Sequence, residues 1–332
     1  MSKLHALSLP LLAALPWLSV QTPGADQESP HRAAVIERLK DELRTSYAFK
    51  DRAAWLVDSL TRNERLGEYA GLGTAELGAA LTEDLRGWTS DKHFMVAHMP
   101  KLEEQLRAPS AATEETPEGF DDPQEVAVNY GVRRAEMLDD RVALIRLDRV
   151  AYSPNTVFAF QEALVGLPEA GALLLDLRDN HGGSAEMVPL LLSCFFDRGE
   201  QVELGTRYWR PDDRTTPIQT QPNLPGVRYY DHPILILTSR DTRSAAEALA
   251  YHLRAFGRAY VVGERTSGGA HPADMVSLGD GFVALIPMGI VTSARTGTDW
   301  EGRGVPIDVP CAAAEAQDRA HQLALRLLEN AR

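Results

Sequence analysis

Cysteines and basic residues are scarce in this chain of 332 residues, and each shortage excludes a class of function. The two cysteines, Cys194 and Cys311, lie far apart, and no HExxH-type helix occurs, so we expect no metal and no cofactor. They could form a disulfide, but two isolated buried thiols fit at least as well. Lys and Arg number 34 against 47 Asp and Glu, a net charge of −13, so we expect no nucleic-acid partner.

Long apolar runs are also missing, except at the beginning of the chain. Residues 1–25 combine Lys3 and His5 with LHALSLPLLAALPWLSV and the small residues TPGA, a pattern typical of a signal peptide cleaved near Ala25. The alternative is a short N-terminal helix, although prolines interrupt it. We therefore expect export to the periplasm or the extracellular space, and no membrane span in the mature chain.

The remaining chain divides by pattern into four parts. Residues 30–105 carry apolar residues at helical spacing, which predicts a small N-terminal helical bundle. Residues 106–125 are rich in Pro, Ala, Thr and acids and lack periodicity, so they indicate a linker. Across 126–315 short apolar runs alternate with helical segments, which predicts an α/β domain. Residues 316–332 complete an amphipathic C-terminal helix.

The expected elements of the α/β domain can be stated one by one. Strands are predicted at 142–147, 172–177, 233–238, 259–263 and 282–287, and helices near 154–167, near 185–197 and after Ser244.

The most informative segment, 233–269, is predicted to form a strand, a sharp turn, a helix and a second strand, with Ser244 opening the helix. A serine there can be a nucleophile, because the free N–H groups and positive end of the helix favour a developing oxyanion. Ser244 can equally be a plain N-cap residue. Likewise, the paired glycines Gly182 and Gly183 could offer an oxyanion-hole N–H or only form a tight turn.

Several separated motifs carry a family resemblance. DLRDNHGG, SAAE, VVGERTSGG and EGRGVPIDV resemble the tail-specific proteases, also called C-terminal processing peptidases. DKHF, NYGVRRAEML and GGAHP resemble the branch that contains interphotoreceptor retinoid-binding protein modules. The resemblance covers residues 30–315. It implies a serine peptidase with a ClpP/crotonase-like αβ core and Ser244 as its nucleophile.

The resemblance also bears on the general base. One group in the family pairs its serine with a lysine where this chain has Gly269, and every lysine of this chain precedes Ser244. A second group, similar to the tricorn protease, uses a histidine from before the core and a carboxylate near its end. His93 in SDKHF and Glu301 in WEGRG match those motifs, which implies His93 as base and Glu301 as the residue that orients it.

Competing interpretations remain for these assignments. His93 could be an ordinary turn histidine, and Glu301 could ion-pair with Arg303. His271 is a rival base whose better-supported role is a wall of the cleft or a substrate contact.

The helix after Ser244 supplies further candidates. Its first N–H, that of Ala245, is the other expected oxyanion donor, and Glu247 is expected to cap the first turn or support the site. His252 lies eight residues after Ser244, about 12 Å along the helix, too far for direct proton transfer.

The sequence thus predicts an exported serine endopeptidase that acts through an acyl-enzyme on extended or C-terminal segments of a polypeptide substrate. The alternative is a non-catalytic module that binds hydrophobic small molecules such as retinoids or lipids. The oligomeric state and the natural substrate are left open.

Overall fold

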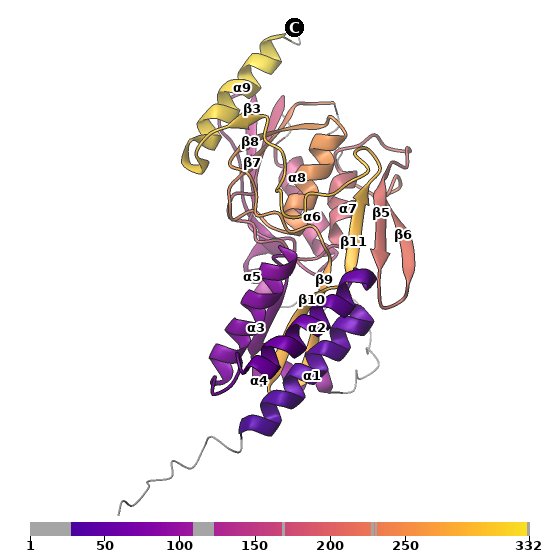
Figure 1. Ribbon diagram of the computed structural model, residues 1–332. Coiled ribbons are helices and arrows are strands. Elements are labelled where there is room, and N and C mark those ends of the chain that lie inside the picture. The colour runs from indigo at the N-terminus through magenta and orange to yellow at the C-terminus, as the bar shows by residue number, and fades with distance from the viewer. Residues whose placement is uncertain (1–27, 109–122, 168–169, 227–228, 230, 331–332) are drawn as a thin grey trace, which may run out of the picture.

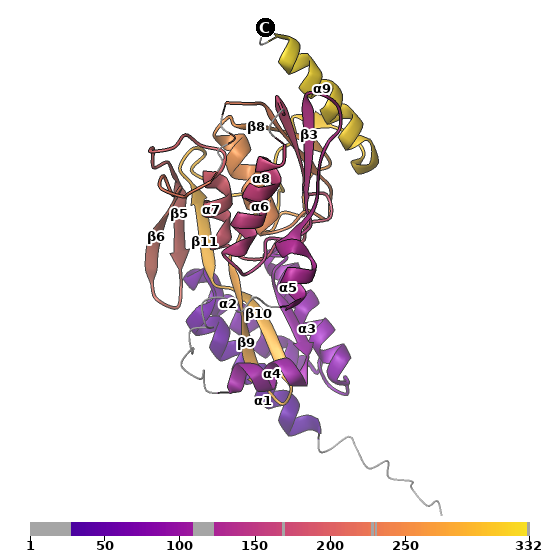
Figure 2. The same cartoon turned by 180° about the vertical axis from the view of Figure 1, so that it is seen from behind.

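The computed structural model describes residues 28–108, 123–167, 170–226, 229 and 231–330. Its N-terminal helices gather around a small sheet at one end of the molecule, and a larger sheet with helices on both faces forms the other end (Figure 1). The C-terminal helix lies farthest from the N-terminal helices, as the reverse view also shows (Figure 2).

The larger sheet confirms the predicted α/β core. Its strand order is β12-β8-β7-β4-β3-β2, in which β2 pairs antiparallel with β3 and the other neighbours are parallel. These strands are β2 (Val132–Met137), β3 (Val142–Leu147), β4 (Ala172–Asp176), β7 (Ile234–Thr238), β8 (Ala259–Gly263) and β12 (Val309–Pro310). The helices of the core are α6 (Asn155–Val165), α7 (Met187–Ser193), α8 (Ala245–Ala255) and α9 (Ala316–Asn330).

Strand alternation explains why helices cover both faces of this sheet. In β3, Ala143 and Ile145 join the apolar cluster formed with α6, α7 and α8, whereas Val142 and Leu144 pack with α9. Successive side chains of a strand point to opposite faces, so a strand with apolar side chains on both faces needs cover on both sides.

The N-terminal part is not built from helices alone. Its helices are α1 (Glu28–Ser46), α2 (Lys50–Leu66), α3 (Thr74–Thr89) and α4 (Pro100–Arg107). They pack with an antiparallel sheet of order β1-β10-β9, formed by β1 (Met95–His98), β10 (Phe282–Pro287) and β9 (Ala273–Gly279). The strand expected at 282–287 exists, but it joins this sheet because Phe282, Ala284 and Ile286 alternate toward the helices.

A second small sheet was not expected from the sequence. It has the order β11-β5-β6 and consists of β5 (Glu203–Trp209), β6 (Arg214–Gln219) and β11 (Gly289–Ser293). It lies beside α7 and α8 in both views (Figures 1 and 2). Its half-exposed, arginine- and threonine-rich strands lack the apolar runs that mark buried strands.

Short elements complete the description: α5 (Pro123–Ala127), η1 (Asn129–Gly131) and η2 (Ala313–Glu315). The expected signal peptide, 1–25, and most of the expected linker, 106–125, lie outside the described residues. Cys194 is buried, Cys311 is half-buried, and both are free thiols. Within the described ranges, no helix is both long and apolar enough to cross a membrane.

Candidate active site

Ser244 occupies a sharp turn between β7 and α8. Its backbone has φ 49° and ψ −118°, a conformation that non-glycine residues rarely adopt and that costs about 1–3 kcal/mol. The turn is anchored because Thr242 Oγ1 donates to the Leu177 carbonyl and the Arg243 N–H donates to the Asn180 carbonyl. Ser244 therefore lies at the N-terminus of α8, where it lines two neighbouring cavities.

Glu247, one turn into α8, holds this region together. Its fully buried carboxylate accepts the Ser244 N–H at 2.9 Å, as expected of a residue that caps the first turn. It also accepts hydrogen bonds from the loop after β8: the Thr266 hydroxyl at 2.5 Å, the Gly268 N–H at 2.6 Å and the Gly269 N–H at 2.9 Å. Burial raises the pKa of Glu247, and these donors oppose the rise.

The candidate oxyanion donors differ in whether their N–H groups already donate to an acceptor within the described structure. A Cβ built at Gly182 would lie 2.8 Å from Ser244 Cβ, so the glycine turn lies directly against the serine. The Gly182 N–H, however, donates to Asn180 Oδ1 at 2.8 Å. The N–H groups of Gly183 and Ala245 donate to no acceptor among the described residues, so the structure favours Gly183 over Gly182.

His93 lies in the turn between α3 and β1, with its side chain 16% exposed. It lines a cavity of about 630 Å³ together with Ser244 and Gly183. No hydrogen bond joins the Ser244 hydroxyl to His93 within the described part of the chain; such bonds are often long before substrate binds. Gly269 fits closely against the imidazole, since a Cβ there would lie 2.8 Å from His93 Cε1.

Two carboxylates lie beside His93. Asp91 Oδ1 accepts the His93 N–H at 3.0 Å and lies 3.6 Å from Nδ1 of the ring. One side-chain ligand atom each of Asp91, His93 and Glu301 lies within 4.8 Å of the others, a grouping that could also hold a cation. The structure thus places both Glu301 and Asp91 beside His93. Asp91 lies within the motif SDKHF but was not predicted as a site residue; its position two residues before the histidine was the available signal.

Glu301 is fixed by backbone donors. Its Oε2 accepts the Ala270 N–H at 2.5 Å and the His271 N–H at 3.2 Å, whereas its buried Oε1 has no hydrogen-bond partner among the described residues. Burial and the nearby charge of Asp91 raise the pKa of Glu301. The alternative ion pair with Arg303 is not formed in the described structure, where Arg303 contacts Asp299.

His271 is buried and is not among the residues that line the two cavities beside Ser244, so the structure does not give it the expected place on the cleft wall. Its Nδ1 lies 2.6 Å from Asp91 Oδ2, and its Nε2 lies 3.8 Å from Asp299. Burial alone would lower the pKa of His271, but Asp299 and Asp91 outweigh it and raise that pKa to about 9. His271 therefore holds Asp91 in place.

Two neighbouring residues have other contacts. Lys92 Nζ donates to the Ser267 carbonyl at 2.6 Å and is exposed. His181 Nδ1 lies 3.1 Å from the Asp241 carbonyl, and its side chain lines the His93 cavity.

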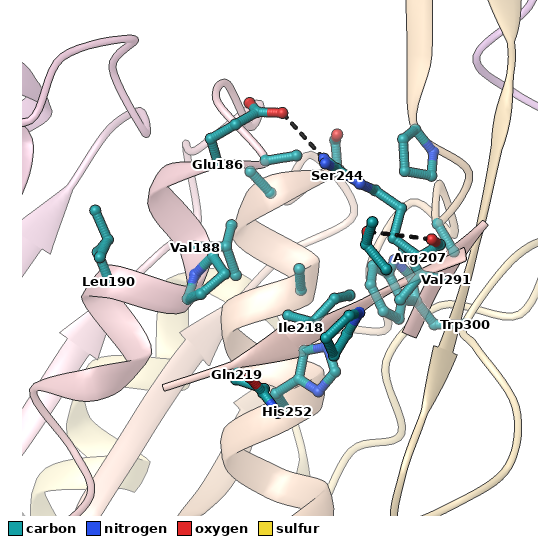
Figure 3. Close-up of a pocket in the computed structure, with 18 of the residues that line it drawn as sticks. Glu186, Val188, Leu190, Arg207, Ile218, Gln219, Ser244, His252, Val291 and Trp300 are labelled. Atoms are coloured by element: carbon teal, nitrogen blue, oxygen red, sulfur yellow. Dashed lines mark hydrogen bonds and ion pairs between the residues drawn. The ribbon is translucent and has the colours of Figure 1, made fainter. Parts of the chain in front are cut away.

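A second cavity of about 350 Å³ extends from Ser244 along α8 (Figure 3). Its walls come from α7, α8, β5, β6, β11 and the segment that holds Trp300. The unexpected sheet β11-β5-β6 therefore forms one wall of the cavity.

Comparison with known proteins shows the family of the chain. The model of peptidase family S41 matches residues 141–311, just over half of the chain, and the model of the N-terminal domain of peptidase S41 in eukaryotic IRBP matches residues 29–130. A chloroplastic C-terminal processing peptidase of Tetradesmus obliquus is 31% identical over 166 residues, 48% of this chain and 33% of that protein. A chloroplastic carboxyl-terminal-processing peptidase 2 of Arabidopsis thaliana is 30% identical over 169 residues, 49% of this chain and 30% of that protein.

The match thus spans a third or less of the length of these relatives. Among solved structures, mature CPAF complexed with lactacystin aligns with a TM-score of 0.61 at 15% identity, covering 90% of this chain and 99% of that one. A lipoprotein from Streptococcus agalactiae aligns with a TM-score of 0.59 at 16% identity, covering 94% and 99%. At these identities the likeness concerns the fold. The family match, which covers more than half of the residues, shows that the chain belongs to peptidase family S41.

Proposed function

We propose that this chain is a serine endopeptidase in which Ser244 attacks the scissile carbonyl and His93 is the general base. The observation that carries the proposal is the shared cavity: it is lined by a serine in a strained turn at the start of a helix, by His93 and by Gly183. The N–H groups of Gly183 and Ala245 donate to no acceptor among the described residues, so we assign them as donors to the oxygen of the scissile carbonyl.

The proton transfers follow from the same contacts. His93 takes the Ser244 proton as the tetrahedral intermediate forms and returns it to the leaving amine, which gives an acyl-enzyme that water then hydrolyses. Asp91 and Glu301 stabilise the imidazolium by their charge. Nδ1 of His93 has no hydrogen-bond partner among the described residues, and Asp91 Oδ1 lies 3.6 Å from it, so we assign Asp91 to orienting the ring when this contact shortens. In this proposal Glu301 supports the imidazolium by its charge and fixes the loop at Ala270.

Substrate and location belong to the same proposal. The relatives are named as C-terminal processing peptidases, so we propose extended or C-terminal segments of polypeptides as the substrates. Export to the periplasm or the extracellular space rests on residues 1–25 of the sequence.

The second candidate function is binding of hydrophobic small molecules, which the largely apolar cavity of about 350 Å³ favours. A small alkyl fluorophosphonate separates the two, because it reacts only with an activated serine. We expect covalent labelling of the wild type at Ser244, no labelling of Ser244→Ala, and labelling slowed by about 10²–10⁴ in His93→Ala. Equal labelling of the wild type and Ser244→Ala, or none of either while both remain folded, would contradict the peptidase.

A further inference from the structure

The cavity of about 350 Å³ runs along one face of α8. Ser244 lies at its beginning, and Ala245, Ala248 and His252 follow on the same face. In Figure 3 Ser244 lies at one end of the drawn residues, and Gln219 and His252 lie at the other. An acyl group bound to Ser244 would therefore have this cavity beside it.

The walls are mainly apolar and the charges are paired. Apolar side chains that line the cavity include Val188, Leu190, Ile218, Val291 and Trp300. Arg207 and Glu186, which also line it, form an ion pair of 3.0 Å on the Ser244 side of the cavity (Figure 3). An apolar group is favoured in this space, and an unpaired charge would lose its hydration there without a free counter-charge.

His252 is the exception within these walls. It is 1% exposed, and its buried Nδ1 has no hydrogen-bond partner among the described residues. Burial lowers the pKa of His252 to about 4, so at neutral pH the ring is uncharged and offers one N–H and one lone pair. His252 is a polar side chain that lines a mainly apolar wall, so an occupant that forms a hydrogen bond with its imidazole is favoured over an isostere that does not.

We propose that this cavity receives the side chain of the substrate residue whose carbonyl Ser244 attacks, and that His252 selects a long side chain with an apolar body and an uncharged polar tip, tyrosine above all. The inference rests on the proposed peptidase function and adds its side-chain specificity. His252 is a specificity residue in it and takes no part in proton transfer.

Length and chemistry both favour tyrosine. His252 lies about 12 Å along the axis from Ser244, and helical side chains lean toward the N-terminus, so a long side chain is needed to approach the ring. A phenol hydroxyl can donate to the imidazole lone pair or accept from its N–H. Phenylalanine fills the same volume but cannot form a hydrogen bond with the imidazole, and alanine leaves most of the cavity empty.

Peptidyl diphenyl phosphonates that differ only in a tyrosine or phenylalanine side chain beside the phosphorus test this directly, because they label the serine through this subsite. We expect the second-order rate of wild-type labelling to be about tenfold or more higher for the tyrosine compound. His252→Leu should remove or invert that ratio, and His252→Gln, which retains an uncharged polar tip, should preserve part of it. His98→Leu, an exposed histidine on β1, is the matched control and should leave the ratio unchanged.

The small alkyl fluorophosphonate is run in parallel, because it has no side chain for the cavity. If it fails to label Ser244, the proposed function fails, and the subsite falls with it. If it labels Ser244 while the tyrosine and phenylalanine compounds react equally, or while the tyrosine preference survives in His252→Leu, the subsite assignment is wrong and the peptidase stands. If His252→Leu does not fold, the wild-type ratio of the labelling rates for the tyrosine and phenylalanine compounds decides alone whether the subsite assignment stands.

Discussion

At the scale of single residues, the buried pair of Asp91 and His271 organises the proposed base. Asp91 accepts from His271 through one oxygen and from the backbone of His93 through the other, so His271 influences His93 without touching it. Both members are almost fully buried, and a buried pair loses stability sharply when one partner is removed or neutralised. Burial alone would raise the pKa of Asp91, but its contacts with His271 and His93 outweigh burial and lower that pKa.

Stability should therefore depend on pH through His271. Its folded-state pKa of about 9 lies above the unfolded value of about 6.5, so its contribution is complete below pH 6.5 and is lost as the pH rises through 9. We expect the unfolding free energy of the wild type to fall by about 3 kcal/mol across this window relative to His271→Gln. Urea unfolding at several pH values measures this. Parallel pH profiles for the two proteins would contradict it, and His98→Gln should follow the wild type.

At the scale of elements, the start of α8 and the loop that follows β8 depend on one carboxylate. Glu247 accepts hydrogen bonds from Ser244, Thr266, Gly268 and Gly269. Thr266 in turn accepts the Val305 N–H at 2.8 Å, which extends the network toward the C-terminal segment. These hydrogen bonds fix the Ser244 turn and Gly269, which packs against His93, relative to each other.

Glu247→Ala should therefore be among the more damaging substitutions in the core. It leaves three backbone N–H groups and one hydroxyl without acceptors, so we expect the unfolding free energy to fall by about 3 kcal/mol or more. Urea denaturation measures the loss, and fluorophosphonate labelling should slow at the same time because the turn loosens. Glu162→Ala on the exposed face of α6 serves as the control and should change stability by less than about 0.5 kcal/mol. A similarly small loss in Glu247→Ala would refute the structural role.

At the scale of the whole molecule, the N-terminal helices and the core cannot be separated cleanly. Strands β9 and β10 follow α8 and β8 in sequence, yet their apolar residues Leu278, Phe282, Ala284 and Ile286 lie in one cluster with α1, α2 and α3. His93 comes from this N-terminal part and Ser244 from the core, and both line one cavity. The proposed site is thus formed between parts of the chain that share their packing.

This shared packing predicts a single unfolding transition. Leu81 is fully buried in α3. Its replacement by alanine should lower the unfolding free energy by about 2–5 kcal/mol and move the unfolding transition of the whole chain to lower temperature. Differential scanning calorimetry together with the loss of fluorophosphonate labelling checks whether one event accounts for both signals. Leu66→Ala is the matched control, because Leu66 is 68% exposed. A separate early transition in Leu81→Ala, with labelling retained above it, would show independent parts.

The local pattern of the sequence was sufficient to predict four strands of the core and to name the candidate catalytic residues. Apolar runs predicted β3, β4, β7 and β8, and the motifs named Ser244, His93 and Glu301, because strand burial and motif spacing are written in neighbouring residues. Only the tertiary structure could decide which residues far apart in sequence meet. Long-range packing moved β10 to the N-terminal helices and placed Asp91 between His93 and His271. It also directed the Gly182 N–H to Asn180 and enclosed His252 in the cavity behind the serine.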